Sequence, residues 1–594
     1  MLRPFLLASA ILLSCALTPT RAEVRLTHDA DGYRLLRDGK PFLIKGGGGD
    51  GKALPSLSAA GGNSVRLWGD EALGETLDAA QKLGLTVTAG IWLGQVRQGF
   101  DWTDAEGLAK QRDHIREVVE KYRHHPALLC WGLGNEMEDG EGKNGAVWTA
   151  INSLAVMVRQ LDPDHPTMTV IAEIGGSKVK NIHRLCPEID IIGINSYAGA
   201  TSLPERYRKA GGTKPYILTE YGPAGIWEVK RDSLGAYPEP TSTAKAATYR
   251  SNYQAAVLGS KGLCLGSYAF LWGQKQEVTS TWFSMFLSDG SRLAPADAIS
   301  ELWSGKAPSN RCPEITTFAL ETPASGKPGT TVKVKLAASD PENDKLQAEW
   351  SLQHDPEQYG SGGDKESAPP IVSGAIVHSD LTGAELRLPA EGGLYRLFAT
   401  VRDGHGGAAV GNIALRVEAP ITVAPAGKAT LPLTVYSEDG ENPSYIPSGW
   451  MGDAKSIKLD PASTTDPHSG KTCLKCEFQG TQGWGGVVWQ NPAGDWGDRG
   501  GGFDMTGAKK ITFWARGDAG GEVVNFEFGV LAADKKFHDS AKGALPKVSL
   551  SKEWQRFEIP VAGSDLSRIK TAFVWTLASP GHPVAFYLDD IRWE

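Results

Sequence analysis

The chain has 594 residues, of which 41% are hydrophobic and 22% charged; this length favours several domains, and this composition is typical of globular proteins. The formal net charge is -8 and no run of lysine or arginine stands out, which argues against nucleic acid as a partner and favours a neutral one. The seven cysteines are too few to form a disulfide framework.

The first 22 residues are expected to be a signal peptide. Arg3 supplies a positive charge, residues 5–17 form a short apolar segment, and a cleavage site follows Ala22. A loose lipobox ending at Cys15 is the alternative, and it would give the protein a lipid anchor. We therefore expect an exported protein, whether periplasmic, cell-surface or extracellular. No later segment is long and apolar enough to predict a transmembrane helix.

Between about residues 40 and 305, short apolar strands alternate with helical stretches. This alternation predicts a parallel sheet covered by helices, and eight such units match the size of a (β/α)8 TIM barrel, which we place at residues 23–305. An open doubly wound sheet is the alternative. Strands are expected at residues 42–45, 64–68, 86–93, 128–133, 167–172, 189–195, 216–219 and 262–271. Helices are expected at residues 71–82, 106–122 and 146–161.

A glycine-rich segment at residues 46–53 follows the first expected strand and resembles a phosphate-binding loop. Ala53 stands where that pattern needs a serine or threonine hydroxyl for magnesium, and Pro55 interrupts the helix that should follow. The glycines are better explained by a loop that passes close to the barrel mouth. We therefore expect no nucleotide, no other cofactor and no metal in the reaction.

After Trp303 the pattern changes to short strands in which polar and apolar residues alternate, which is typical of all-β sandwiches. An immunoglobulin-like sandwich is expected at residues 313–418 and a second all-β domain at 431–594. The first should contain strands at residues 331–337, 346–353, 394–402 and 412–417. The second should contain strands at residues 472–479, 485–490, 510–516, 524–531, 555–560 and 584–593.

The last domain resembles the galactose-binding-like jelly rolls that accompany carbohydrate-active enzymes, on residues 511–516 and 586–591. Trp484, Trp489 and Trp496 could form a sugar platform of a carbohydrate-binding module, or pack in the core. Two further motifs could each be functional or structural. Acidic residues at 340–344 favour a solvated turn over a calcium loop, and the CxxC at 473–476 lies in a β-type segment that disfavours redox or zinc chemistry.

Two glutamates close apolar strands of the expected barrel. Glu136 ends the segment that follows Leu128, and Glu220 ends the segment that follows Pro215. The C-terminal ends of barrel strands open on one face, where the active sites of such barrels lie. Two carboxylates on that face are the minimal machinery for cleaving a glycosidic bond.

The motifs around these glutamates resemble a known group of enzymes. Residues 131–136 (Trp-Gly-Leu-Gly-Asn-Glu) and 219–222 (Thr-Glu-Tyr-Gly) are similar to those of the large glycosidase clan with catalytic glutamates after strands four and seven. Residues 122–126 (Tyr-Arg-His-His-Pro), preceding the first motif, make the barrel most similar to that of glycoside hydrolase family 2. The resemblance implies a retaining mechanism with Glu136 as acid/base and Glu220 as nucleophile. It also implies that Asn135 bonds the 2-hydroxyl group of the sugar.

Other side chains at strand ends are expected near these glutamates. The clan resemblance implies that Arg66 bonds the nucleophile, although a structural ion pair is the alternative. Tyr197 could bond Glu220, Trp272 could form the floor of the subsite nearest the scissile bond, and Trp68 could line a neighbouring subsite or pack in the core. Glu173, after the fifth strand, is a rival carboxylate outside the motif.

We therefore expect a retaining β-glycoside hydrolase with an oligo- or polysaccharide substrate. Two alternatives stay open. The motifs are also similar to fungal-type β-1,3-glucanosyltransferases, so the enzyme could transfer the sugar instead of releasing it to water. A non-catalytic carbohydrate-binding protein on the same barrel is the other alternative. The chain also differs from family 2, whose β-sandwich domains usually precede the barrel.

Overall fold

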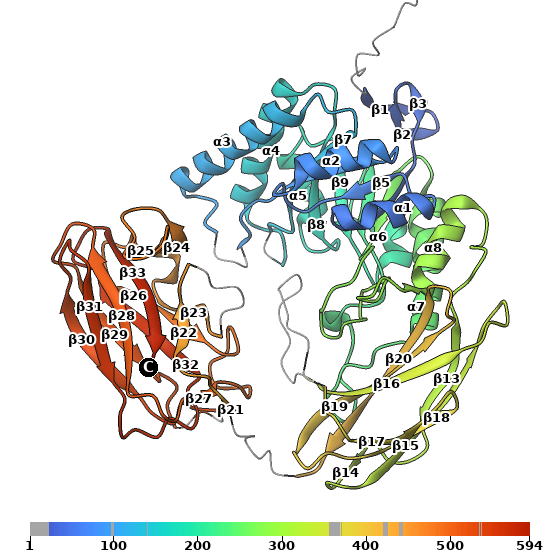
Figure 1. Cartoon of the computed structure of the whole chain (residues 1–594). Coiled ribbons are helices and arrows are strands. Elements are labelled where there is room, and N and C mark those ends of the chain that lie inside the picture. The colour runs from blue at the N-terminus through green and yellow to red at the C-terminus, as the bar shows by residue number, and fades with distance from the viewer. Residues whose placement is uncertain are drawn as a thin grey trace, which may run out of the picture. The chain divides into compact units, whose positions relative to one another are not determined.

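The computed structural model describes residues 23–96, 100–138, 140–355, 369, 371–419, 426–438, 444–533, 535 and 537–594. The expected signal peptide at residues 1–22, including Cys15, lies outside these ranges. The chain forms two compact units, Met1–Pro420 and Ile421–Glu594, which we describe separately (Figure 1). Within the described ranges, no helix is both long and apolar enough to cross a membrane.

Eight parallel strands of the first unit close into a barrel, which confirms the predicted fold class. Their order around the barrel is β10-β11-β4-β5-β6-β7-β8-β9. All eight fall on or next to the predicted segments: β4 (Ile44–Gly48), β5 (Ser64–Arg66), β6 (Thr86–Ile91), β7 (Leu128–Asn135), β8 (Thr167–Ala172), β9 (Ile191–Asn195), β10 (Tyr216–Glu220) and β11 (Cys264–Ala269). Almost every residue of these strands is buried, as expected for a parallel sheet covered by helices.

A helix follows each barrel strand, and the helices surround the sheet (Figure 1). Many apolar residues on these helices, such as Leu73 and Leu77 on α2, pack against the barrel in one continuous core. Asp104 and Asn144 cap the first turns of α3 and α4. The helices are α1 (Leu54–Ala59), α2 (Leu73–Lys82), α3 (Ala105–Tyr122), α4 (Gly145–Leu161), α5 (Lys178–Leu185), α6 (Leu203–Lys209), α7 (Ser242–Asn252) and α8 (Ala294–Ser304).

A small antiparallel sheet that was not predicted lies at the N-terminal ends of the barrel strands. It consists of β1 (Val24–Asp29), β2 (Gly32–Arg37) and β3 (Lys40–Pro41). Val24 and Leu35 pack into a cluster with barrel residues such as Ile44. The backbone of this sheet also bonds the segments that precede β8 and β11. The sheet therefore closes the end of the barrel that is opposite the predicted site.

The first strand was predicted two residues too early, and the glycine-rich segment belongs partly to it. Gly46, Gly47 and Gly48 lie within β4, where a side chain at each would collide with Tyr268, Trp272 or Trp68. These three glycines therefore serve close packing at the barrel wall.

A two-sheet β-sandwich completes the first unit. One sheet has the order β12-β20-β19-β16, with β14 beside β20, and the other has the order β13-β15-β18-β17. The strand β12 (Arg292–Leu293) comes from the barrel segment after β11, so the two parts share a sheet. The remaining strands are β13 (Glu314–Leu320), β14 (Ser325–Gly326), β15 (Thr331–Ser339), β16 (Gln347–His354), β17 (Ile376–Ser379), β18 (Gly383–Arg387), β19 (Gly393–Arg402) and β20 (Gly407–Val417).

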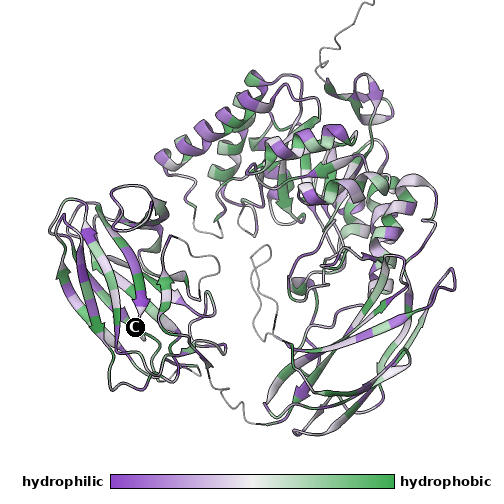
Figure 2. Cartoon of the chain, in the orientation of Figure 1, coloured by the Kyte–Doolittle hydropathy of each residue, from purple (hydrophilic) through white to green (hydrophobic). Residues whose placement is uncertain are grey.

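The second unit is another antiparallel two-sheet sandwich. One sheet has the order β24-β25-β33-β28-β31, with β22 beside β33, and the other has the order β23-β26-β32-β29-β30. Hydrophilic and hydrophobic residues alternate along its strands (Figure 2). The strands are β22 (Leu433–Tyr436), β23 (Ile446–Gly452), β24 (Ile457–Ser463), β25 (Cys473–Phe478), β26 (Trp484–Gln490), β28 (Lys510–Gly517), β29 (Val523–Phe528), β30 (Gly543–Ser549), β31 (Gln555–Pro560), β32 (Thr571–Ala578) and β33 (Val584–Trp593), with β21 (Gly427–Lys428) pairing β27 (Phe503–Asp504).

The two motifs that the sequence left open in these sandwiches have structural roles. Asp340 accepts hydrogen bonds from the backbone of Glu342 and Asp344 and so stabilises a turn. Cys473 and Cys476 lie on β25 as free, buried thiols, and burial raises the pKa of Cys473 to about 11 and that of Cys476 well above its usual range. A thiol in such a site stays protonated and is a poor nucleophile or metal ligand.

Candidate active site

The two glutamates lie at the C-terminal ends of barrel strands four and seven. Glu136 directly follows β7, and Glu220 is the last residue of β10. Glu136 has a positive φ of 53°, which is uncommon for a residue with a side chain. Its backbone N–H still bonds Val170 O at 2.9 Å on the neighbouring strand, so the strained residue is anchored in the barrel wall.

Glu220 is 7% exposed and accepts three side-chain hydrogen bonds. Its Oε1 accepts from Arg66 Nη1 at 2.9 Å and from Trp68 Nε1 at 2.7 Å. Its Oε2 accepts from Tyr197 OH at 2.8 Å. Arginine and the indole N–H can only donate, so both carboxylate oxygens act as acceptors in a fixed orientation. The three partners are all residues that the sequence nominated.

A chain of hydrogen bonds joins the two glutamates. Arg66 bonds Glu220 through Nη1 and Asn135 Oδ1 through Nη2 at 2.7 Å. Asn195 Nδ2 donates to the same Asn135 oxygen at 3.2 Å and to Glu136 Oε1 at 2.6 Å. Thr219 Oγ1 donates to Asn195 Oδ1 at 2.8 Å and so determines which way that amide points. The position of each carboxylate therefore depends on the other through buried polar groups.

The amide of Asn135 has a definite orientation because of these contacts. Its Oδ1 accepts from both Arg66 and Asn195, while its backbone oxygen accepts from Gln95 Nε2 at 2.7 Å. Within the described residues, no protein group accepts from Asn135 Nδ2, and Asn135 lines the pocket beside Glu136. The NH2 group is thus available to donate to a bound molecule.

Tyr197 is held in an aromatic cluster at the wall of the site. Its ring lies edge-on to Phe270 at 6.0 Å and to Trp227 at 5.5 Å between centroids, and Val278 belongs to the same cluster. Burial, followed by the charge of Glu220, holds the pKa of Tyr197 well above its usual range. The hydroxyl therefore remains a donor to Glu220 at any pH at which a folded protein would normally work.

A pocket of about 700 Å3 opens at these residues. Besides both glutamates, its lining includes Trp68, Trp92, Tyr197 and the segment after β11 with Lys275 and Glu277. Lys275 Nζ and Glu277 Oε2 form an ion pair at 2.6 Å. The pocket thus combines aromatic walls with several carboxyl groups, the type of lining found in small-molecule and sugar sites.

The structure corrects the prediction for Trp272. Its side chain is 1% exposed, stacks on Trp303 at 5.2 Å between centroids, and donates from Nε1 to Ser56 Oγ at 3.0 Å. It therefore packs in the core and lies outside the lining of the pocket that holds the two glutamates, although it borders a neighbouring pocket on the same face of the barrel. The reason is a turn of the backbone after β11, which brings Phe270 and Leu271 to the pocket instead.

The rival carboxylate, Glu173, also lines the pocket but is already neutralised. Arg206 binds both of its oxygens, at 3.0 and 3.2 Å, and Ser196 Oγ donates to it as well. A carboxylate bound by both arms of an arginine side chain is suited to a structural role in the pocket wall.

Sequence reasoning missed Asn195, Lys275 and Glu277. Asn195 could have been found, because it ends the predicted sixth strand as Glu136 and Glu220 end theirs. Lys275 and Glu277 lie in a segment without regular strand or helix pattern, and no sequence signal connects them with the barrel mouth.

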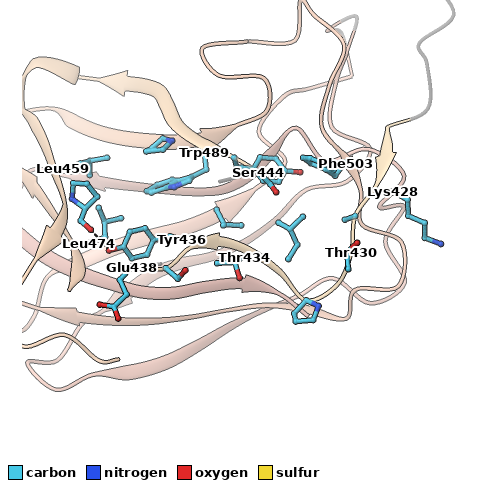
Figure 3. A pocket seen from close by; sticks show the side chains of 18 residues that line it. Lys428, Thr430, Thr434, Tyr436, Glu438, Ser444, Leu459, Leu474, Trp489 and Phe503 are labelled. Atoms are coloured by element: carbon cyan, nitrogen blue, oxygen red, sulfur yellow. Dashed lines mark hydrogen bonds between the residues drawn. The ribbon is translucent and has the colours of Figure 1, made fainter. Parts of the chain in front are cut away.

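The second unit has a hollow of its own, of about 850 Å3, which lies against the strand β22 (Figure 3). Trp489, which lines it, is 1% exposed and belongs to the core of the unit. Among the described residues of the lining, Glu438 carries the one carboxylate, and it accepts from the backbone of Lys471 and Thr472. Trp484 and Trp496 are 47% and 36% exposed. A sugar platform can therefore involve those two residues but not Trp489, and its existence stays a prediction.

Comparisons with known proteins agree with the motifs. Residues 69–292 match the model of the TIM barrel domain of glycosyl hydrolases family 2, which confirms the resemblance. A β-glucuronidase of Paenibacillus borealis is 27% identical over 243 residues, covering 34% of this chain and 38% of that protein. The chain thus spans less than half of the length of this curated relative.

Solved structures of β-glucuronidases are similar to about half of the chain. That of an uncultured Clostridium species has a TM-score of 0.39 and 19% identity, and that of Dictyoglomus thermophilum has 0.39 and 20%. Each comparison covers 48% of this chain and 54% of the other chain.

Proposed function

We propose that this protein is a retaining glycoside hydrolase that cleaves β-glycosidic bonds of an oligo- or polysaccharide by double displacement. The observation that carries the proposal is the hydrogen-bonded chain from Glu136 through Asn195, Asn135 and Arg66 to Glu220. Retaining enzymes need two carboxyl groups about 5–5.5 Å apart across the scissile bond. The buried side chains that link Glu136 and Glu220 are suited to keeping the distance between the two carboxyl groups constant.

In the first step, Glu220 attacks the anomeric carbon while Glu136 gives its proton to the glycosidic oxygen of the leaving sugar. A covalent glycosyl-enzyme forms and the C–O bond to the leaving group breaks. The donors around Glu220 hold its carboxylate in one rotamer, so little reorganisation is needed at the moment of attack. In this mechanism Asn135 Nδ2 donates to the sugar, which is the 2-hydroxyl contact that the family resemblance implies.

In the second step, Glu136 takes a proton from water, and the resulting hydroxide attacks the anomeric carbon and releases Glu220. Two inversions leave the configuration of the sugar unchanged. The sugar itself is open. The relative from Paenibacillus borealis is called a β-glucuronidase, and Lys275 puts an ammonium group in the pocket lining, so aryl β-glucuronides belong in the first panel with β-glucosides, β-galactosides and β-mannosides.

The decisive test changes one carboxylate at a time. Glu220→Gln and Glu136→Gln should each lower kcat/KM by at least 10³-fold, with an unchanged thermal transition. Azide should rescue Glu220→Gly and give a glycosyl azide of inverted configuration, because azide attacks from the face that Glu220 leaves. Glu173→Gln should cost far less, since its charge serves Arg206. Near-normal turnover in Glu220→Gln would contradict the proposal.

Product analysis separates the two alternatives. A transglycosylase would convert a trisaccharide into longer chains because another sugar replaces water in the second step. A carbohydrate-binding protein without activity would bind glycans from the panel and release no sugar from any of them.

A further inference from the structure

A second pocket, of about 880 Å3, opens on the same face of the barrel. It lies among the segments that follow β4, β5 and β11, and Asp50, Glu71 and Gln274 belong to its lining. Trp68 and Leu271 line both this pocket and the catalytic one. The two hollows therefore meet at these side chains and can receive consecutive parts of one molecule.

We propose that the second pocket binds the sugars that precede the cleaved bond, so that the enzyme acts within a β-linked glycan chain and does not remove single terminal sugars. This inference rests on the proposed function, because it assigns the substrate of the same site. Its chemical class is a neutral, β-linked oligosaccharide of at least two sugars on the glycone side.

The position of the pocket determines which end of the substrate it receives. The nucleophile attacks the sugar on the glycone side, and the acid protonates the oxygen of the sugar that leaves. Trp68 bonds the nucleophile Glu220 and forms a wall of the second pocket. The segment after β11 carries part of this pocket, and β11 adjoins β10, which ends in Glu220. In contrast, β7, which precedes Glu136, adjoins none of β4, β5 and β11. The pocket thus extends the nucleophile's side of the site.

The lining has the composition that sugar rings require. Trp68 and Phe286 are partly exposed aromatic side chains, which offer apolar faces to the C–H groups of a pyranose. Thr76 and Leu67 form a buried floor, and the exposed Lys52 lies at the rim. The lining combines apolar surface with a few polar groups that can orient a hydroxylated ligand.

The charge of the rim argues for a neutral chain. Asp50 and Glu71 are opposed by Lys52 alone, and among the described residues neither Lys52 nor Glu71 forms an ion pair through its side chain. A polyanionic glycan would therefore meet a small net negative charge at the rim. Hydroxyl groups, in contrast, can accept from the ammonium and donate to the carboxylates.

The test compares substrates that differ only in length. Once the panel has identified a sugar, we would measure kcat/KM for its p-nitrophenyl β-glycoside and for the p-nitrophenyl β-glycoside of its trisaccharide. We expect at least a tenfold higher value for the trisaccharide, and products of two or more sugars from the polysaccharide. Equal values, or release of single sugars only, would overturn the inference and leave the proposed function standing.

A variant that fills the pocket links this preference to the site. Ala72 is exposed, lines the second pocket and is the N-cap residue of α2, where its side chain makes no capping hydrogen bond. Ala72→Trp should lower the ratio of trisaccharide to monosaccharide kcat/KM at least fivefold. Ala105→Trp, at the exposed start of α3 and in the lining of neither pocket, should keep the wild-type ratio. An unchanged ratio in Ala72→Trp would refute the assignment, whereas failure of the wild type to cleave any glycoside would refute the proposed function instead.

Discussion

At the scale of single residues, the two glutamates of the site are held by side chains that donate hydrogen bonds to them. Glu220 has three direct donors, and Glu136 is held by Asn195, whose own orientation depends on Thr219. The donors come from the ends of β5 and β9, so a change at one of these strands alters the direction of a carboxylate on β7 or β10. Positioning of this kind contributes to the rate because the reacting groups need not reorganise.

Asn195→Ala should lower kcat/KM about 10²-fold on p-nitrophenyl glycosides, which is the lower range of a general acid's contribution. The physical reason is that Glu136 loses a donor at 2.6 Å and Asn135 loses one of two. To check this, kcat/KM of the variant and the wild type is also measured with a 2,4-dinitrophenyl glycoside, whose leaving group needs little protonation. The loss should be markedly smaller there. An equal loss on both substrates would mean that Asn195 does not act through Glu136.

Gly48→Ala should disturb Glu220, the proposed nucleophile, without touching it. A Cβ atom at this position would lie 2.7 Å from the Trp68 ring, so the indole must move and its bond to Glu220 must lengthen. We expect kcat/KM to fall at least tenfold and the free energy of unfolding to fall by about 1–3 kcal/mol. Gly175→Ala is the control, because Gly175 has open space around its Cβ position. Wild-type kinetics in Gly48→Ala would show that Trp68 has no role in positioning Glu220.

At the scale of elements, the segment after β11 connects the pocket with the sandwich. Lys275 and Glu277 line the pocket, while Val278 has a φ of 64°, an outlier for a β-branched residue, and is buried in the cluster that contains Tyr197. Glu239 accepts from Thr279 Oγ1 at 2.7 Å and from Thr281 Oγ1 at 2.8 Å. Strain at Val278 is thus maintained by the anchors on its C-terminal side.

Thr279→Val should loosen this segment while keeping its volume. Glu239 loses one buried donor, which should cost about 1–3 kcal/mol of unfolding free energy. We expect a severalfold lower kcat/KM as Lys275 and Tyr197 become less well placed. Calorimetry and kinetics on one preparation check both effects. Thr316→Val, on an exposed strand residue, is the control and should change neither. Loss of stability with unchanged kinetics would show that the segment after β11 does not position the side chains of the site.

At the scale of the whole molecule, the first sandwich and the barrel form one compact unit. Asn412 Nδ2 donates to Glu239 at 2.6 Å, Arg396 Nη2 to Tyr237 O at 3.1 Å, and the backbone of Val410 to Ser242 Oγ at 2.9 Å. With β12 paired to β20, these contacts make the sandwich a support for the barrel mouth. The second unit has its own core and hydrogen-bonded sheets.

The buried Glu239–Lys245 pair should make the first unit sensitive to acid. Burial alone would raise the pKa of Glu239, but Lys245, with Arg396 and hydrogen bonds, holds it below its ordinary value. A lowered carboxyl pKa contributes stability above the unfolded value of about 4.3, and this stability is lost as pH falls through the folded value. The thermal transition of the first unit should therefore decline below about pH 4.

Glu239→Gln tests this assignment. It leaves Lys245 buried without its counter-charge and should cost about 3–5 kcal/mol at pH 7, with a shallower decline in acid. Glu314→Gln, at an exposed site on β13, should reproduce the wild-type curve. An acid decline as steep in Glu239→Gln as in the wild type would assign the sensitivity to other groups.

The sequence by itself determined the barrel, the longer strands of both sandwiches and the two glutamates, because strand periodicity and residues at strand ends are local properties. It also led to Arg66 and Tyr197, since parallel strands bring their ends to one face. Only the tertiary structure decided that Trp272 is in the core, that Asn195 holds Glu136, and that the segment after β11 forms a wall supported by the sandwich. Those outcomes depend on the path of irregular backbone and on contacts between residues far apart in the chain, which no local pattern encodes.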